Sequence, residues 1–427
     1  MHRDIAEQPA WQLYSQRQRW SFLAILFLVS MSNNADRTVM SVLLEPIKLE
    51  FAVSDAKMGL LSGFAFAVFY AVLGLPVARL ADRKDRRLII TLALAAWSVM
   101  TMLCGVARTF PQLFLTRMGV GVGEVGAIPL SQSLIADYFP PAQRARALAI
   151  FISASTVGYL IAFGVGAHLA AAYGWRSAFI ALGAPGLLLC LLTWVGLKEP
   201  RRLPGRAVRE ATNESLVNTC KALARKRSFV LLVVAMVLFY LVTNGAVSWF
   251  PAYMVRVLKL SLADTGVAFG LTGAVGSLTG TLCGGWLLDK LAVRDARWLG
   301  WLPSLLMIVT WPIYTLALLT DNFTLFLSMT LAAGITLGAA VPALFTLLHR
   351  ICGSQRRALA VAIILFFANL LGGGFGPLIT GAVSDVFTAS MGSVGLRYAL
   401  LSTMAILVPA ALTPIFIVRS LERDSES

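Results

Sequence analysis

Ala78-Arg-Leu-Ala-Asp82-Arg83-Lys-Asp-Arg-Arg87 places acidic residues inside a basic cluster, directly after a long apolar run. A shorter copy, Gly285-Trp-Leu-Leu-Asp289-Lys290, follows another apolar run at an offset of 207 residues. The segment Gln143-Arg-Ala-Arg146-Ala-Leu-Ala149 likewise recurs as Gln355-Arg-Arg357-Ala-Leu-Ala360, at an offset near 211. Two matches at nearly the same offset predict two structurally related halves.

Apolar runs dominate the rest of the chain. Of its 427 residues, 58% are hydrophobic and 13% are charged. Each run is long enough to cross a hydrocarbon core of ~30 Å, and none alternates as a barrel strand would. We therefore predict an all-α integral membrane fold, with twelve transmembrane helices in two pseudo-symmetric six-helix bundles. The predicted spans are 20–44, 57–81, 88–107, 111–138, 143–172, 175–197, 228–256, 263–288, 298–319, 322–349, 355–387 and 393–419.

The distribution of charge predicts the orientation. If the N-terminus is cytoplasmic, loops on its side hold 26 of the 36 Lys and Arg residues and the opposite loops hold seven. This positive-inside bias places both termini in the cytoplasm, and it explains the net charge of +15 without nucleic acid. The predicted parts are a cytoplasmic tail (1–19), an N-terminal bundle (20–197), a basic cytoplasmic linker (198–227), a C-terminal bundle (228–419) and a second cytoplasmic tail (420–427).

The strongest functional candidates inside the predicted spans are four ionisable residues: Asp36, Arg37, Arg117 and Glu124. Such residues are costly in a membrane and are functional candidates by default. At a rise of ~1.5 Å per residue, Asp36, Arg37 and Arg117 lie at a similar depth. Glu124 follows Arg117 by almost two turns and shares its helix face. A polar stripe leading toward the membrane centre is predicted.

Several motifs resemble the major facilitator superfamily. The first quoted segment is similar to its loop signature G-x-L-x-D-R-x-G-R-R, although Ala78 and Asp85 replace the two glycines. Arg117-x-x-x-Gly121-x-Gly123 with Pro129 resembles the motif of the fourth helix. Within the superfamily, the spinster-like lysolipid transporters are similar in Asp36-Arg37 with Val42-Leu-Leu, Gly121-Val-Gly-Glu124 and Leu134-Ile-Ala-Asp137-Tyr-Phe-Pro140. Organic anion symporters of the superfamily carry a similar Asp-Arg pair.

The resemblance implies a secondary transporter that works by alternating access, with no cofactor. A carboxylate whose arginine contact changes with conformation can load and release a proton. We therefore expect Asp36 and Glu124 to couple protons, and Arg37 and Arg117 to switch between them or to bind the substrate headgroup. The alternative is a static buried salt bridge that only fixes helix packing.

Asp82, Arg83, Arg87 and Asp289 form the predicted cytoplasmic gate, because Asp82 could pair with the helix start near Gln355. A simple positive-inside cluster would explain the arginines but not the recurrence of Asp82 as Asp289.

The second half offers an uncharged, aromatic wall to the predicted cavity, which suits the acyl chain of an amphiphile. Such residues can instead serve packing or contact lipid. The candidates for the substrate path are Phe239, Tyr240, Asn244, Trp249, Phe345, Phe366, Phe367 and Asn369.

The expected substrate is a lysophospholipid or a related single-chain lipid, and the alternative is a small organic anion. Expected partners are that substrate, protons and membrane lipids, with no nucleic acid, for a monomer in a bacterial inner membrane. Scattered Cys and His residues predict no metal site. Gly121-Val-Gly-Glu-Val-Gly126 matches a dinucleotide motif but lacks a preceding strand. No HExxH or GxSxG motif supports a lipid enzyme, and a sensor that no longer transports remains a further alternative.

Overall fold

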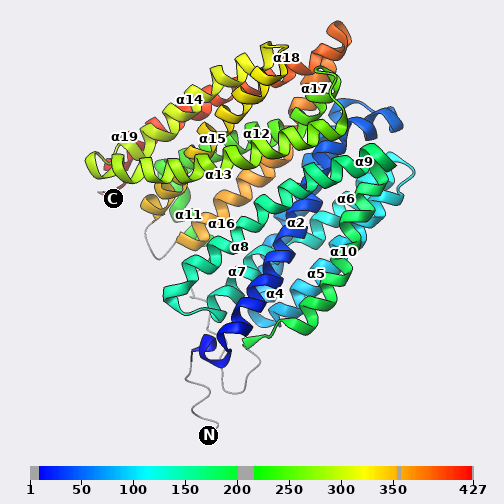
Figure 1. Ribbon diagram of the computed structural model, residues 1–427. Helices are drawn as coiled ribbons and strands as arrows, with labels where there is room; N and C mark the ends of the chain where they lie inside the picture. The colour runs from blue at the N-terminus through cyan, green and yellow to red at the C-terminus, as the bar shows by residue number, and fades with distance from the viewer. Residues whose placement is uncertain (1–8, 201–215, 353–356, 426–427) are drawn as a thin grey trace. The chain divides into compact units, whose positions relative to one another are not determined.

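The computed structural model describes residues 9–200, 216–352 and 357–425. These residues are helical or form short connections, and no strand occurs among them (Figure 1). The first half contains the helices η1 (Ala10–Leu13), α2 (Gln16–Phe51), α3 (Asp55–Gly59), η2 (Leu60–Phe64), α4 (Ala65–Arg83), α5 (Arg86–Val106), α6 (Phe110–Glu124), α7 (Ala127–Tyr138), α8 (Pro141–Ile161), η3 (Ala162–Gly166), α9 (Ala167–Tyr173) and α10 (Trp175–Gly196).

The second half begins with a short helix in the predicted linker. Its helices are α11 (Leu216–Arg225), α12 (Arg227–Arg256), α13 (Leu262–Arg294), α14 (Trp298–Leu319), α15 (Phe323–Cys352), α16 (Arg357–Phe367), η5 (Ala368–Gly373), α17 (Gly374–Met391), η6 (Gly392–Val394), α18 (Gly395–Ala405) and α19 (Leu407–Ser425). The segments η2, η3 and η5 are π-helical, and each lies within a longer helical stretch.

Capping side chains explain several helix starts. Asp85 accepts a hydrogen bond from the Leu88 amide at the start of α5, and Thr109 does the same for Gln112 at the start of α6. Ser54 caps α3 through the Lys57 amide. These contacts satisfy amides that the first helical turn leaves without partners.

The predicted span 111–138 corresponds to the apolar stretch Phe110–Tyr138, which is divided into two helices. α6 ends at Glu124, and α7 begins at Ala127 after Gly126, whose φ is +83°. Glycine adopts this left-handed conformation without the steric cost that a Cβ brings. Pro129 lies in the first turn of α7, where its missing amide is tolerated. The break places the end of α6, with Glu124, in the interior of the span.

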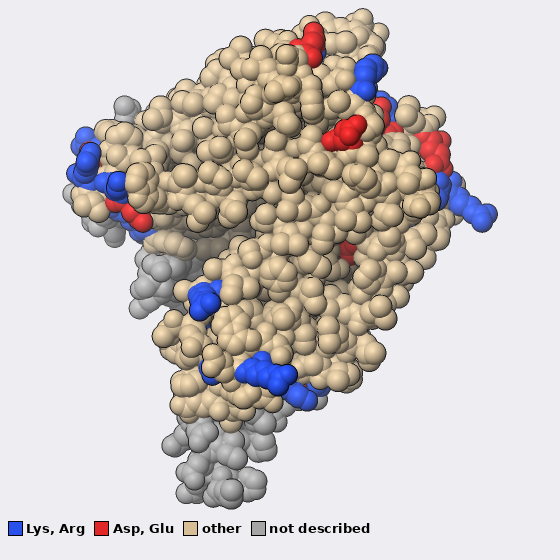
Figure 2. Space-filling view, viewed as in Figure 1, with Lys and Arg blue, Asp and Glu red and all other residues tan. Residues whose placement is uncertain are grey.

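Ten helical stretches among the described residues are long and apolar enough to cross a membrane. One of them, Leu359–Val418, covers most of two predicted spans, and α2, which holds the predicted span 20–44, is not among the ten. Large apolar side chains such as Leu188, Leu191 and Leu282 lie exposed on helices. Most of the surface visible in Figure 2 carries no charge, as a lipid-facing surface requires.

The chain divides into two compact units. The first consists of Met1–Leu43 and Val68–Ala211, and the second of Leu44–Ala67 and Thr212–Ser427. In the first unit, α5 packs along both α6 and α10. In the second, α15 packs along α13 and α14, while α12 packs along α19 and α17. The segment Leu44–Ala67, which joins two helices of the first half, packs in the second unit.

Candidate functional site

The charged residues predicted inside the membrane come together in the first unit. α2 carries Asp36 and Arg37, and α6 carries Arg117 and Glu124. Asp36 and Arg117 are completely buried, Glu124 is 1% exposed, and Arg37 is partly exposed. Arg37 is therefore the most accessible member of this group.

Arg117 binds backbone, not a carboxylate. Its Nη1 donates to the carbonyl oxygen of Asp36 at 3.2 Å, and its Nη2 donates to the carbonyl oxygen of Arg37 at 3.5 Å. These contacts join α6 to α2 at the depth where the two helices were expected to meet. The Arg117 charge also acts on the Asp36 carboxylate, together with Trp97 and Ser32. Arg117 is thus close to Asp36 without forming an ion pair with it.

Glu124 lies at the end of α6, where the helix stops. The charges of Arg37, Arg117 and Asp36 all act on it, so the four residues form one electrostatic cluster. The preceding residue is a glycine because α5 lies against it: a Cβ on Gly123 would stand 2.6 Å from the backbone nitrogen of Trp97. This close approach brings Trp97 to the same cluster.

The two carboxylates have an unusual environment. Among the described residues, Oδ1 and Oδ2 of Asp36 and Oε1 and Oε2 of Glu124 are buried and lack a well-formed hydrogen bond, while the polar side chains of Trp97 and Ser32 approach Asp36 and that of Asn33 approaches Glu124. Buried polar groups are normally paired, and an unpaired charge in a dry interior is very costly. The arrangement is therefore suited to carboxyl groups whose charge changes during a working cycle, and poorly suited to a static brace.

The predicted substrate path belongs to the second unit, and its residues differ in exposure. Trp249 is completely buried, where its Nε1 donates to the carbonyl oxygen of Pro377 at 2.8 Å. Phe239 is also buried. Phe367 is exposed, and the remaining candidates are partly exposed, namely Tyr240, Asn244, Phe345, Phe366 and Asn369. Trp249 and Phe239 therefore pack the second unit, and the assignment of the other six to a substrate path stays a prediction.

The predicted cytoplasmic gate is only partly described. The side chains of Asp82 and Arg83, and the helix start near Gln355, lie outside the described residues. Arg87 stacks on the ring of Trp194 at 4.4 Å and donates to its carbonyl oxygen at 3.3 Å, both within the first unit. Asp289 is exposed. The gate stays a prediction.

Arg86, which the sequence did not single out, lies at the centre of a buried cluster. Its guanidinium donates to Glu199 through Nη2 at 2.6 Å, to Asp137 at 2.6 Å and to Ser133 at 2.8 Å. We call Arg86, Ser133, Asp137 and Glu199 the Arg86 cluster. A sequence signal existed: Glu199 is an isolated acidic residue at the start of a basic linker.

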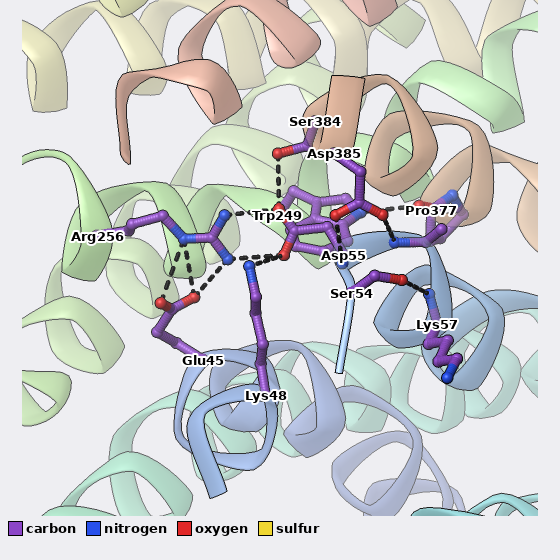
Figure 3. A network of polar contacts seen from close by, with 11 residues as sticks. Glu45, Lys48, Ser54, Asp55, Lys57, Trp249, Arg256, Pro377, Ser384 and Asp385 are labelled. Atoms are coloured by element: carbon purple, nitrogen blue, oxygen red, sulfur yellow. Dashed lines mark hydrogen bonds and ion pairs between the residues drawn. The ribbon is translucent and has the colours of Figure 1, made fainter. Parts of the chain in front are cut away.

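A second unexpected cluster lies in the second unit (Figure 3). Arg256, at the end of α12, forms ion pairs with Glu45 and Asp55. These residues stand at the ends of the predicted spans, where charges are common. The signal that could have revealed them is Glu45, which lies between an apolar helical run and Pro46.

No group of three or more His, Cys, Asp or Glu residues suited to a metal ion occurs in the described part of the chain.

Comparisons with known proteins agree on one family. The model of the Major Facilitator Superfamily matches residues 26–377. An MFS-type efflux pump of Mycolicibacterium smegmatis is 35% identical over 92% of this chain and 90% of that protein. A probable L-galactonate transporter of Escherichia coli is 27% identical over 95% and 90% of the two chains. A bacterial homologue of the human lysosomal transporter Spinster, crystallised in an inward-facing and unoccupied conformation, matches with a TM-score of 0.87 and 30% identity, over 96% of this chain and 99% of that chain.

Proposed function

The chain belongs to the major facilitator superfamily, and we propose that it is a proton-coupled transporter that moves a lysophospholipid or a related single-chain lipid across the membrane by alternating access. It is a transporter and not an enzyme. We further propose that it acts as a monomer in a bacterial inner membrane, with both termini in the cytoplasm, as the positive-inside bias favours.

The observation that carries proton coupling is the pair of buried carboxylates without a well-formed hydrogen bond. Asp36 and Glu124 lie within the electrostatic reach of two arginines, yet none of their oxygens accepts a well-formed hydrogen bond among the described residues. Arg117 donates instead to two backbone carbonyls. A small movement of its guanidinium would move its charge onto or away from a carboxylate, and the proton would leave or return accordingly.

Arg37 is the proposed contact for the substrate headgroup. It is partly exposed, whereas Arg117 is completely buried and already bound to backbone. Guanidinium groups bind phosphates and carboxylates with two parallel hydrogen bonds. An anionic headgroup on Arg37 would compete with Glu124 for the same positive charge, which links substrate binding to the protonation of Glu124.

The lipid is favoured over other substrates by two features. The chain resembles a bacterial homologue of Spinster over nearly its whole length. The second unit also offers Phe345, Phe366 and Phe367, which are at least partly exposed, to an acyl chain. Aromatic and aliphatic surface contributes to binding in proportion to the apolar area that it buries.

A small organic anion is the second candidate, because the similarity to a probable L-galactonate transporter covers 95% of this chain. The same Arg37 would then hold the carboxylate of the substrate. The headgroup chemistry of the two candidates is shared, so only the apolar part of the ligand distinguishes them.

Uptake into proteoliposomes tests both proposals. Radiolabelled lysophospholipids and sugar acids are compared, each with and without a pH gradient, and protein-free liposomes control for spontaneous lipid movement. We expect lysophospholipid uptake that increases when the gradient is imposed. Uptake of sugar acids alone would replace the lipid by the organic anion, and transport that ignores the gradient would remove proton coupling.

A further inference from the structure

Buried polar atoms without a well-formed hydrogen bond gather around Asp36 in the first unit. In the described part of the chain they include both carboxylate oxygens of Asp36, Oγ of Ser32, Nε1 of Trp97, Oγ1 of Thr101 and Nε of Arg117. α2 supplies Ser32 and Asp36, α5 supplies Trp97 and Thr101, and α6 supplies Arg117. We call these five residues the Thr101 site. The proposed function gives roles to Asp36 and Arg117 but none to the other three.

Thr101 lies on one face of α5, between two residues that interact with the charged groups. Trp97, four residues earlier, approaches Asp36. Cys104, three residues later, feels the charges of both Arg117 and Asp36. Residues at these spacings share one face of a helix. Thr101, which is completely buried, therefore faces the same charges.

Complete burial makes unpaired polar atoms costly at this place. Asp36, Trp97, Thr101 and Arg117 are all 0% exposed. A hydroxyl or N–H group without a partner in a protein interior keeps its full desolvation penalty. Native structures pair such groups with protein atoms or with ordered water, and a buried water typically makes about three hydrogen bonds to groups that the protein does not satisfy itself. Several such groups lie together at the Thr101 site, so bound water would satisfy them at once.

The donors and acceptors of the Thr101 site select water among small ligands. Nε1 of Trp97 and Nε of Arg117 can only donate, so they need an occupant that accepts hydrogen bonds, and together with the arginine charge they repel a metal cation. The ionised carboxylate of Asp36 only accepts, so it needs an occupant that donates, and it repels an anion. The hydroxyls of Ser32 and Thr101 do either. Water meets all of these requirements, because it both donates and accepts.

The titratable and charged groups around the site come from the same three helices. Besides Asp36 they are Arg37 on α2, Cys104 on α5, and Arg117 and Glu124 on α6. Backbone carbonyls of α2 already bind Nη1 and Nη2 of Arg117, which leaves Nε for another partner. The charge of Arg117 also acts on the Asp36 carboxylate. Water on this Nε would therefore interact with a fixed positive charge and with a carboxyl group that can change its charge.

We propose that the Thr101 site binds water inside the first unit and that this water carries protons to and from Asp36. A hydronium ion at the site gives its extra proton to a carboxylate oxygen of Asp36: an O–H bond of the hydronium breaks, the carboxyl O–H bond forms, and neutral water remains. Release of the proton reverses these changes. Thr101 and Trp97 act as positioning residues, because they hold the water and exchange no proton with Asp36 themselves.

The proposal rests on the proposed function for the role of Asp36, but not on the identity of the substrate. The competing explanation is a dry site, in which Trp97 and Ser32 contact the carboxylate directly and the Thr101 hydroxyl has no function.

Infrared difference spectroscopy tests the bound water without any substrate. Purified protein in lipid is measured at two pH values, and Asp36→Asn identifies the carboxyl band of Asp36 by its loss. We expect a water O–H stretching band that changes together with this carboxyl band and shifts in water made with the heavy oxygen isotope. Thr101→Val, which keeps the shape of the side chain without its hydroxyl, should abolish or displace the water band, and Thr101→Ser should keep it.

Ser98→Ala is the matched control for the infrared measurement. Ser98 is as fully buried on α5 as Thr101, and its hydroxyl also lacks a partner among the described residues, but this hydroxyl faces Gly186 of α10. The water band should therefore be unchanged in Ser98→Ala. An Asp36 carboxyl band with no isotope-sensitive water band, or a water band that is the same in Thr101→Val, would overturn the proposal.

Transport separates the proposed water relay from the proposed function as a whole. We expect Thr101→Val to slow pH-driven uptake by about tenfold or more, as the loss of a hydrogen bond to a charged group does, and to spare substrate exchange without net proton movement. Thr101→Ser should retain fast uptake, and Ser98→Ala should match the unaltered protein. Equal pH-driven rates in Thr101→Val and Ser98→Ala would overturn the relay. Absence of pH-driven uptake in the unaltered protein would count against the proposed function, while the infrared bands would still decide whether bound water delivers the proton of Asp36.

Discussion

Arg86→Met should be among the most destabilising single substitutions in the first unit. The change removes every guanidinium contact to Glu199, Asp137 and Ser133. Glu199 is 1% exposed at its side chain and would lose its guanidinium partner while it keeps the bond from the Arg86 backbone amide. Loss of one partner from a buried ion pair costs about 3–5 kcal/mol. At roughly 2 °C per kcal/mol for a unit of this size, the melting temperature should fall by about 6–10 °C.

Thermal unfolding in detergent measures this effect, with a thiol-reactive dye that reports exposure of the buried Cys104 in a variant whose other four cysteines are replaced. Arg87→Met is the matched control: Arg87 stacks on Trp194 and contacts Asp85 at 3.7 Å, so its loss should cost about 1 kcal/mol or less. Removing both charges with Arg86→Met and Glu199→Leu should recover much of the stability. The reasoning is refuted if Arg86→Met melts like Arg87→Met, or if the double variant is no more stable than the single one.

Two further substitutions address the charged cluster and its support. Glu124→Gln should abolish the response of uptake to a pH gradient and spare substrate exchange. Asp321→Asn is the control, because its carboxylate is 84% exposed, and it should leave both unchanged. An intact pH response in Glu124→Gln would remove Glu124 from proton coupling. Gly123→Ala should lower stability by about 1–3 kcal/mol, because its Cβ would meet the Trp97 backbone at 2.6 Å. Gly164→Ala, with open space at its Cβ, should have no comparable cost, and equal melting temperatures of the two variants would contradict the packing argument.

Helix content followed from the sequence because membrane-spanning helices need long apolar runs and few charges. The interruptions within these helices did not follow from the sequence. Gly126 breaks the span of α6 and α7, but glycine is also common inside unbroken membrane helices, so its presence alone does not predict a turn. The π-helical segment Leu60–Phe64 likewise lies in an ordinary apolar run. Such irregularities depend on which helix packs alongside, and that information is not local.

The candidate site could be predicted from the sequence because charges inside a membrane helix are costly and rare. Asp36, Arg37, Arg117 and Glu124 stand out because each is costly where it lies. The buried arginines Arg86 and Arg256 do not stand out, since they are at helix ends, where charges usually meet water. Their burial results from partners far away in the chain: Glu199 is 113 residues from Arg86, and Glu45 is 211 residues from Arg256. Only the tertiary fold brings these groups together.

The buried carboxylates of this protein are of two kinds, one bound by cations and one not, and the difference indicates different roles. Asp55 is bound by Arg256, Lys48 and Ser384, so its charge is balanced and its position is fixed. Asp36 and Glu124 are equally buried but accept no well-formed hydrogen bond among the described residues. A protein gains nothing in stability from an unpaired carboxyl group in its interior. The unpaired carboxyl groups are therefore the ones to which the proposed function assigns the proton, and the paired ones hold helices together. If Asp36→Asn and Glu124→Gln leave stability unchanged or raise it while pH-driven uptake is lost, that assignment of roles holds; a marked loss of stability in both would assign these carboxylates to packing instead.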